Sequence, residues 1–423
     1  MLENEGPVAL AGADRAGTGQ QQFRPYTPPH RQRQVAGSQC RISRDAPVAW
    51  SSQQLDAIER IETWLGKGDR PFFYLAGFAG TGKTTTQRRI ADVAGDNVLF
   101  AAFTGKAASV MARKGCVGAT TLDRLIYHHP FQWRCAQDCR VPPCADLCRH
   151  AWQEFGGRQL NLRSAVAGAD LVIVDEVSMV GEEMARDLLS FETPILVIGD
   201  PGQLPPINGS GYFTEREPDA FLTEIHRQAA GNPIIDLATM AREERALPLG
   251  PHGDSTVMRI NDFKDNPTDF DIVICGRNDT RRQINSHTRR LLGFTDPLPM
   301  VGEKLLILRN RPRQGLMNGE VVTVTGVGDE AKGFLPLGVV TDDGRAVKIN
   351  APADLLLADD SKPEGVPGDP VTWGYCLTGH KSQGSQWDRV LLVDEARCFR
   401  EQQFRWRYTS ITRAAERITV LNT

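Results

Sequence analysis

Short apolar runs alternate along the chain with longer polar stretches, and this alternation predicts parallel β-sheets. The first four runs lie at residues 72–76, 98–103, 171–174 and 195–198. Strands that are apolar throughout are buried on both faces, which requires helices on both sides of the sheet. We therefore expect an α/β fold, with ligands at the carboxyl ends of the strands, where polar residues follow each run.

The segment before the first run predicts an amphipathic helix. Ser51 or Ser52 can cap its amino end, because a hydroxyl accepts a hydrogen bond from a free backbone N–H there. The apolar residues that recur at helical spacing are Leu55, Ile58, Ile61 and Leu65.

The second half of the chain predicts another parallel sheet with an insertion. Apolar runs at 271–275, 371–376, 390–393 and 418–421 repeat the first pattern. Residues 301–349 instead carry short β-rich runs separated by turn residues, which predicts a small barrel. A helix over 279–292 has four arginines that suit either a nucleic-acid contact or a solvated face, namely Arg281, Arg282, Arg289 and Arg290.

Composition sets limits on class and location. A length of 423 residues is typical of two or three domains. A hydrophobic content of 40% is typical of a globular chain. The net charge of −3 excludes a global basic field but leaves room for a local basic groove. We find no run that could span a membrane and no signal peptide. The nine cysteines are unevenly placed, so we expect a reducing, cytoplasmic location.

Residues 1–47 are rich in Gly, Gln, Pro and Arg, which predicts a disordered tail. Six arginines and no acidic residue lie between Arg15 and Arg44. Such a tail either adds electrostatic affinity for DNA or RNA or is a solvated leader without a role.

Residues 77–84, Gly-Phe-Ala-Gly-Thr-Gly-Lys-Thr, form a complete phosphate-binding loop between an expected strand and an expected helix. We expect Lys83 to reach the β- and γ-phosphates of ATP and the Thr84 hydroxyl to ligate Mg²⁺. The backbone of the loop and the helix amino end complete the cradle. The expected nucleotide contacts here are Gly77, Ala79, Gly80, Thr81, Gly82, Lys83, Thr84 and Thr85.

Two acids and a glutamine at the next strand ends complete the chemistry of ATP hydrolysis. Asp175 can hold Mg²⁺ through water, and Glu176 can orient and deprotonate the attacking water. Gln203, in a rigid Pro- and Gly-rich turn, is placed to sense the γ-phosphate. The alternative for the acids is a pair of surface carboxylates without a catalytic role.

Four cysteines lie close together in the segment 126–168, at positions 135, 139, 144 and 148. Four thiolates are enough for tetrahedral Zn²⁺, which would stiffen a segment too small for a core of its own. The four are Cys135, Cys139, Cys144 and Cys148. An iron–sulfur cluster, free thiols and an adventitious disulfide are the alternatives.

Eight segments, in order, resemble the motifs of superfamily 1 helicases, nearest the RecD/Dda-like branch. Val-Asp-Glu-Val-Ser-Met at 174–179 and Gly-Asp-Pro-Gly-Gln-Leu-Pro-Pro at 199–206 resemble motifs II and III. The other matching segments are Gln54 with Ala57, 103–108, 119–125, 222–228, 377–384 and 408–414. The resemblance runs from about residue 50 to residue 423.

The resemblance implies two RecA-like lobes, at 48–215 and 216–423, with ATP between them. It implies an SH3-like β insert at about 301–365 and places the cysteine-rich insert where relatives carry the pin that splits the duplex. Arg227 and Arg413 are the expected arginine fingers. Gln54 and Gly384 are further expected nucleotide contacts. The expected DNA contacts are Thr104, Lys106, Thr121 and His380, with Trp387 stacking on a base.

The predicted function is an ATP-dependent DNA helicase that moves on single-stranded DNA from 5′ to 3′ and unwinds the duplex. The expected nucleic-acid partners are single-stranded and forked DNA. The expected protein partners are a single-strand-binding protein or replication, repair or recombination proteins. We expect the protein to be a monomer. An RNA or RNA–DNA translocase and an ATP-gated nucleic-acid clamp that does not unwind are the alternatives. Two residues depart from the family pattern: Asp123 replaces a histidine, and Gly379 is expected to loosen its turn.

Overall fold

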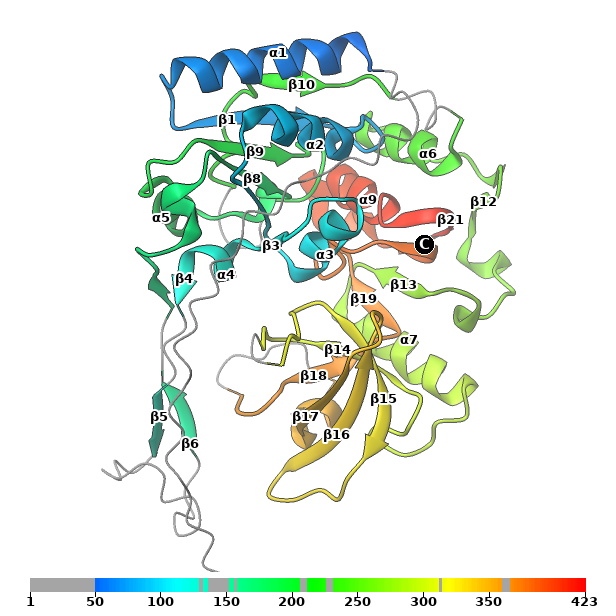
Figure 1. Cartoon of the computed structure of the whole chain (residues 1–423). Coiled ribbons are helices and arrows are strands. Elements are labelled where there is room, and N and C mark those ends of the chain that lie inside the picture. Colours follow the sequence, from blue (N-terminus) through cyan, green and yellow to red (C-terminus); the bar gives the residue numbers. More distant parts are fainter. Residues whose placement is uncertain are drawn as a thin grey trace, which may run out of the picture. The chain divides into compact units, whose positions relative to one another are not determined.

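A parallel six-stranded sheet forms the core of the first lobe (Figure 1). The computed structural model describes residues 50–128, 132–135, 152–155, 158–205, 211–225, 231–311, 314–359 and 366–423, the second and third of these by their backbone. In sheet order the strands are β10 (Ala220–Leu222), β1 (Phe72–Gly77), β9 (Ile195–Gly199), β8 (Leu171–Asp175), β2 (Val98–Ala102) and β3 (Thr120–Thr121). All their pairings are parallel.

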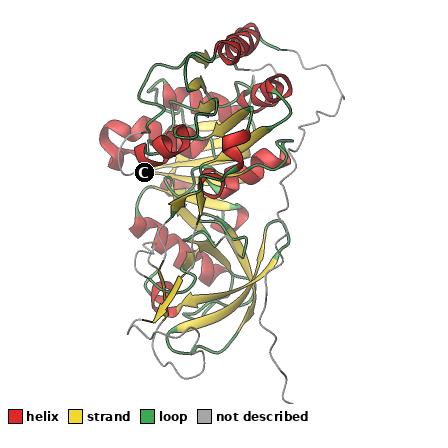
Figure 2. Cartoon of the chain, turned by 60° about the vertical axis from the view of Figure 1, so that its left-hand side comes forward, coloured by secondary structure: helices red, strands yellow, loops and turns green. Residues whose placement is uncertain are grey.

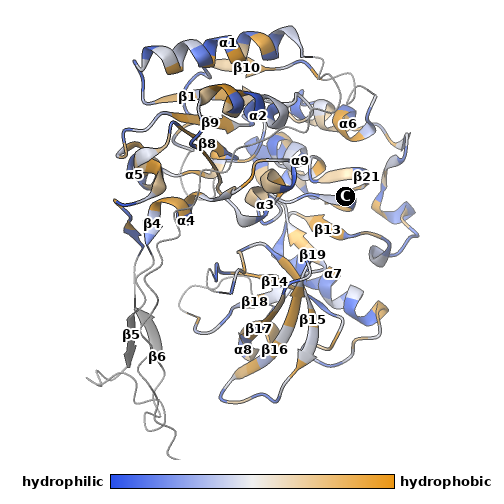
Figure 3. Ribbon diagram, viewed as in Figure 1, coloured by the Kyte–Doolittle hydropathy of each residue, from blue (hydrophilic) through white to orange (hydrophobic). Residues whose placement is uncertain are grey.

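Helices cover both faces of this sheet, as its apolar strands require. The helices are α1 (Ser52–Lys67), α2 (Lys83–Ala94), α3 (Gly105–Arg113), α4 (Leu122–Ile126) and α5 (Glu182–Leu189). Phe73 and Leu75 of β1 pack in one cluster, whereas the alternate residues Phe72 and Tyr74 pack in another. Hydropathy follows the same division, with apolar strands beneath the polar outer face of α1 (Figure 3).

The first helix differs in one respect from its prediction. Ser51 caps α1, and Ile58 and Ile61 face the core as expected. Leu55, however, is 54% exposed, and the buried positions that replace it are Gln54 and Trp64. Gln54 is buried because it caps the helix and contacts the phosphate loop, which apolar periodicity cannot reveal.

The second lobe has another six-stranded sheet. In sheet order its strands are β11 (Gly250–His252), β12 (Ser255–Arg259), β21 (Ala414–Asn422), β20 (Trp387–Asp394), β13 (Ile272–Cys275) and β19 (Cys376–Thr378). The β11–β12 pair is antiparallel and the other pairs are parallel. The helices are α6 (Pro233–Arg242), α7 (Asn278–Leu291) and α9 (Gln403–Ile411), with the 3-10 segment η5 (Ala396–Gln402) before α9.

An antiparallel five-stranded sheet is inserted in the second lobe, with a core of its own (Figure 2). In sheet order its strands are β17 (Ala346–Pro352), β16 (Phe334–Thr341), β15 (Val321–Val327), β14 (Lys304–Ile307) and β18 (Val371–Trp373), and α8 (Ala353–Leu357) follows β17. The prediction of one strand over 371–376 is therefore wrong. The run divides at Gly374, where a side chain would meet the backbone of Leu305 at 3.0 Å.

The arginines of α7 are not a uniform basic face. Arg281 is buried and pairs with Asp359 at 2.8 Å, and Arg289 pairs with the buried Glu303 at 2.6 Å. Neither a nucleic-acid contact nor a solvated face therefore describes Arg281 and Arg289. Their ion pairs instead brace α7 against the insert and its flanks.

The segment 126–168 contains two antiparallel pairs. These are β4 (Tyr127–His128) with β7 (Gln159–Leu160) and β5 (Gln132–Cys135) with β6 (Trp152–Phe155). Cys139, Cys144 and Cys148 lie outside the described residues, and Cys135 is described by its backbone. The metal prediction for this segment is untested by the structure.

Candidate functional site

The phosphate-binding loop joins β1 to α2, and its glycines are required by its backbone. Gly80 and Gly82 have φ values of 81° and 79°, in the left-handed region that favours glycine. A side chain at Gly77 would lie 2.8 Å from the Thr81 hydroxyl, so the turn closes tightly only around glycine. Gly82 is the N-cap of α2 and makes no side-chain bond there, which leaves the helix amino end open to an anion.

Lys83 is folded back over this loop. Its Nζ donates to the carbonyl oxygens of Gly77 at 2.7 Å and Phe78 at 3.0 Å. The same Nζ lies 3.8 Å from Asp200 Oδ2. The amine is therefore held at the mouth of the loop by weak neutral acceptors, which a phosphate oxygen can replace with a charge-assisted bond.

Asp175 and Glu176 lie at the end of β8, which β9 separates from β1 and the phosphate-binding loop in the sheet. Burial raises the pKa of Asp175, and the nearby Lys83 opposes that rise. Burial also raises the pKa of Glu176, opposed chiefly by the guanidinium of Arg413. Glu176 has a φ of 56°, which a non-glycine residue seldom adopts, and strain of this kind gathers at functional sites.

Asp200 and Gln203 occupy the turn after β9. The Gln203 N–H donates to Asp200 O at 3.1 Å, which closes the turn. Gln203 is buried, and its side-chain oxygen has no hydrogen-bond partner among the described residues. A buried acceptor without a donor costs free energy, so this oxygen is suited to a ligand or a water bound at the site.

Gln54 lies against the phosphate loop. Its Nε2 donates to Thr81 O at 3.3 Å, while its Oε1 accepts from the N–H of Ser51 at 3.1 Å. The side chain therefore links the start of α1 to the loop. The amide has a second N–H and a second oxygen lone pair, so a contact with adenine does not require either of these bonds to break.

Arg413 lies directly after α9 in the second lobe. It is buried, and its Nε and Nη1 donate to Thr409 O at 2.9 Å and Ser385 O at 3.2 Å. Its charge acts on Glu176, so the guanidinium and the acids share one site. Arg227 lies outside the described residues.

Residues of the second lobe hold the turn at Leu204 from both sides. The Leu204 N–H donates to the Thr409 hydroxyl at 2.9 Å, and Gln383 Nε2 donates to Leu204 O at 3.0 Å. Sequence reasoning did not single out Gln383, Tyr408 or Thr409. All three lie in the segments that resemble helicase motifs, but only the fold shows which residue of a segment makes the contact.

The five residues predicted to contact DNA gather where the lobes meet, with two exceptions. The Lys106 amine lies 4.4 Å from the ring centroid of Trp387, and a side chain at Gly384 would lie 2.3 Å from the Thr104 hydroxyl. Burial lowers the pKa of Lys106, opposed by Asp342 and Glu320 of the insert.

The exceptions are Thr121 and His380. Thr121 is buried and caps α4 by accepting from the N–H of Arg124. The His380 ring packs 5.4 Å from Phe399, between centroids, and burial lowers its pKa, so it is neutral at neutral pH. Thr104 also caps a helix, accepting from Ala107 at 3.2 Å.

Gly379 does not loosen its turn, and that expectation is wrong. A side chain there would lie 2.4 Å from the indole nitrogen of Trp406 and 3.0 Å from the Ser410 hydroxyl. The Gly379 N–H donates to Cys275 O at 3.0 Å. Gly379 is therefore the small residue that lets Trp406 pack beneath the turn.

No group of three or more His, Cys, Asp or Glu side chains suited to a metal occurs among the residues that the structure describes. Asp175 and Thr84 offer the hard oxygen ligands that suit Mg²⁺, with the other ligands left to phosphate and water. Within the described ranges, no helix has the length and apolar character needed to cross a membrane.

Two protein-family models match parts of this chain. A model of the AAA domain matches residues 49–251, and one of the UvrD-like helicase C-terminal domain matches residues 374–421. The ATP-dependent RecD2 DNA helicase of Deinococcus radiodurans is 28% identical over 81% of this chain and 46% of that protein. The RecBCD enzyme subunit RecD of Mycolicibacterium smegmatis is 24% identical over 82% of this chain and 67% of that protein.

Solved structures of Pif1 helicases share the fold. One, from a study of unwinding at forked double-stranded DNA, has a TM-score of 0.53 and 19% identity, over 88% of this chain and 92% of the other. Bacteroides Pif1 bound to single-stranded DNA has a TM-score of 0.51 and 19% identity, with the same coverage. Both matched domains and both curated relatives make the chain similar to superfamily 1 helicases of the RecD branch, and the Pif1 structures share its fold.

These matches confirm the predicted resemblance to superfamily 1 helicases, and the fold confirms the α/β architecture of two RecA-like lobes with an antiparallel insert. The segments that resemble motifs from Gln54 to residue 228 fall in the first matched range, and those at 377–384 and 408–414 fall in the second. The chain spans about half the length of the first of these relatives.

Proposed function

We propose that this chain is an ATP-dependent DNA helicase that moves on single-stranded DNA and separates duplex strands. The observation that carries the proposal is the meeting of Lys83, the acid pair and Arg413 at one site built by both lobes. A phosphoryl transfer needs a cation on the phosphates, a base for water and an added positive charge on the γ-oxygens.

Each residue of the site has a role in this reaction. Lys83 leaves its carbonyl acceptors and binds the β- and γ-phosphates, while the loop from Gly77 to Thr85 cradles them. Thr84 and Asp175 would hold Mg²⁺, which neutralises phosphate charge when bound. Glu176 takes the proton of the attacking water, the side-chain oxygen of Gln203 accepts from and orients that water, and the Gln203 amide group senses the γ-phosphate. Arg413, with Arg227 as a second finger, stabilises the transition state.

Binding of nucleic acid is assigned to the boundary of the lobes and the insert. Thr104 and Lys106 in the first lobe and Trp387 in the second form the two grips on a strand, and His380, whose ring packs on Phe399, is a further proposed contact of the second grip. Thr121 supports the first grip by capping α4, since its hydroxyl is already used. Trp387 is released for base stacking when Lys106 moves from its ring to a phosphate.

The finer proposals rest on the resemblance. They are movement from 5′ to 3′, an SH3-like insert that braces the strand, and a monomer that works with a single-strand-binding protein or with replication, repair or recombination proteins. Zn²⁺ bound by the four cysteines of 126–168 is a further proposal, tested by elemental analysis of protein purified without chelators. Less than about half an equivalent of zinc or iron would contradict it.

The test of the main proposal is an unwinding assay on matched forked DNA and forked RNA. We expect ATP-dependent unwinding of the DNA fork alone. Unwinding of RNA in preference would favour an RNA translocase. ATP hydrolysis and binding of nucleic acid without strand separation would favour a clamp.

A further inference from the structure

Tyr408 of α9 joins the second lobe to the phosphate-binding loop through its hydroxyl. The Ala79 N–H, in the loop, donates to this hydroxyl at 2.8 Å. The hydroxyl in turn donates to Asp200 Oδ2, in the turn after β9, at 2.6 Å. One hydroxyl from the second lobe therefore contacts two different parts of the nucleotide site in the first.

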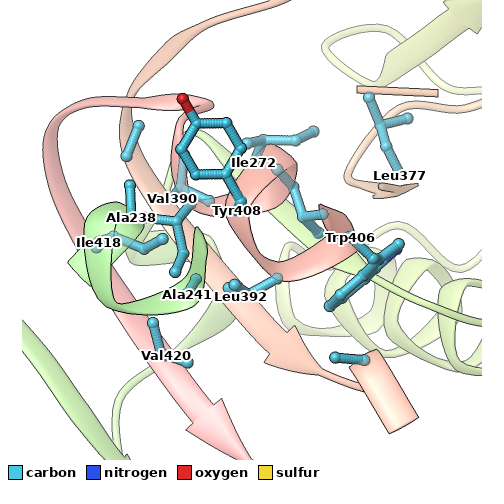
Figure 4. Packing of buried hydrophobic residues seen from close by; sticks show 14 of the residues in the cluster. Ala238, Ala241, Ile272, Leu377, Val390, Leu392, Trp406, Tyr408, Ile418 and Val420 are labelled. Atoms are coloured by element: carbon cyan, nitrogen blue, oxygen red, sulfur yellow. The ribbon is translucent and has the colours of Figure 1, made fainter. Parts of the chain in front are cut away.

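The position of Tyr408 is fixed by packing. Its side chain is 1% exposed, and its ring lies among apolar residues that include Ala238, Ala241 and Val390, with the oxygen directed away from them (Figure 4). A side chain at Gly202 would lie 3.0 Å from the Tyr408 ring, so glycine there makes room for it. Burial and the neighbouring Asp200 raise the pKa of the phenol well above its ordinary value, so it stays a donor.

Asp200 is the point at which Tyr408 meets the phosphate-binding lysine. Its Oδ1 accepts from the Gly202 N–H at 2.9 Å, and its Oδ2 faces both Tyr408 and the Lys83 amine, the latter at 3.8 Å. When Lys83 turns to a triphosphate, Oδ2 loses its cationic neighbour and keeps the Tyr408 hydroxyl. Filling the loop therefore strengthens the bond between Asp200 and the second lobe.

The next residue extends this connection to Arg413. The Thr409 hydroxyl accepts from the Leu204 N–H at 2.9 Å, and its carbonyl oxygen accepts from Arg413 Nε at 2.9 Å. A displacement of α9 at Tyr408 thus moves the carbonyl that aims the guanidinium. The path from the loop to Arg413 runs through two adjacent residues of one helix.

We propose that Tyr408 is a positioning residue that couples occupancy of the phosphate loop to the placement of Arg413. This inference rests on the proposed function, because it assigns Tyr408 a task in ATP hydrolysis by the closed lobes. Tyr408 does not touch the reacting atoms. It acts through Asp200 and through the start of the segment that carries Arg413.

The test is Tyr408→Phe, which removes the hydroxyl and keeps the ring. We expect kcat for ATP hydrolysis, measured with a saturating single-stranded oligodeoxynucleotide, to fall about 10-fold or more, as for a lost hydrogen bond to a charged group. KM and the Kd of a non-hydrolysable ATP analogue should change by less than about threefold, because the loop itself is intact. An unchanged kcat would overturn the proposal.

Tyr127→Phe is the matched control. The Tyr127 hydroxyl also donates to a carboxylate at 2.6 Å, that of Asp187, and lies in the first lobe away from the nucleotide site. It should leave kcat unaltered. An equal loss of kcat in both variants would show a general effect of removing a buried hydroxyl and would contradict the proposal.

A double variant separates coupling from loss of packing. If Tyr408 acts through Asp200, then Tyr408→Phe with Asp200→Asn should lower kcat little more than Asp200→Asn alone. If the double variant instead lost kcat by the product of the two single-variant factors, the residues would act independently and the proposal would be contradicted. If the wild-type protein itself hydrolysed no ATP, the proposed function would fail, whereas normal wild-type turnover with an unaffected Tyr408→Phe would overturn only this inference.

Discussion

The acids at the end of β8 show how single residues decide the chemistry at this site. Burial raises the pKa of Glu176, which makes its carboxylate a stronger base for water, and Arg413 limits the rise so that the group can still ionise. A surface pair of acids would have neither feature. The arrangement therefore favours a catalytic role for these two residues over the alternative of two surface carboxylates without such a role.

The phosphate loop gives the first prediction at this scale. Lys83→Ala should abolish ATP hydrolysis with little loss of stability, because the Lys83 amine donates to two neutral carbonyl oxygens and its 3.8 Å approach to Asp200 is longer than a hydrogen bond. Steady-state turnover and thermal unfolding measure the two effects. Near-wild-type turnover in a folded variant would refute the assignment of the loop.

Glu176→Gln should keep ATP binding and lose turnover, since the amide has the size of the carboxylate but cannot accept a proton. In the wild type, kcat should fall as pH decreases through the raised pKa of Glu176, because the protonated acid is no base. The acid limb should thus lie above the ordinary glutamate pKa of about 4.3. A pH profile of kcat with its acid limb at or below that value would count against this role.

Arg413→Ala should lower nucleic-acid-stimulated turnover by roughly 10³-fold, the low end for a lost arginine finger. ATP affinity should change much less, since the guanidinium acts on charge that develops in the transition state. The turnover number measures the first effect, and the Kd of a non-hydrolysable ATP analogue measures the change in ATP affinity. Arg407→Ala is a control, because Arg407 pairs with Asp394 at 2.7 Å in the same lobe. Equal losses in both variants would make Arg413 structural.

At the scale of elements, the pattern of the sequence predicted most inner strands of the two six-stranded sheets but not their partners. Apolar runs located β1, β2, β8, β9, β13, β20 and β21, because burial on both faces leaves a plain signal. The division of 371–376 between two sheets was not predictable, since both halves are equally apolar and only the approach of Leu305 to Gly374 separates them. The ion pairs of Arg281 and Arg289 depend likewise on residues distant in the chain.

The turn at Gly379 gives a prediction at this scale. Gly379→Ala should destabilise the protein by about 1–3 kcal/mol, because a methyl group there overlaps the Trp406 indole. Gly326→Ala in β15 is the control, since nothing lies within 4 Å of its missing side chain. Denaturant unfolding of both variants measures the difference. Equal stability of the two would contradict the packing argument.

At the scale of the whole molecule, the candidate site depends on contacts between residues far apart in the sequence. The candidate catalytic side chains could be named from the sequence because each lies in a motif with its own signature. The bonds from Ala79 and Leu204 to Tyr408 and Thr409 could not, because no local pattern shows which residues of two lobes will meet. We propose that these contacts couple ATP hydrolysis to movement of the two grips on a strand.

The most direct test of this account is ATP-driven strand separation on two DNA substrates that differ only in carrying a 5′ or a 3′ single-stranded tail. The wild-type protein should unwind the 5′-tailed substrate with ATP, and Lys83→Ala should unwind neither. Preference for the 3′ tail would reverse the polarity and leave the motor standing. Failure to unwind either substrate while ATP is hydrolysed would contradict the central claim.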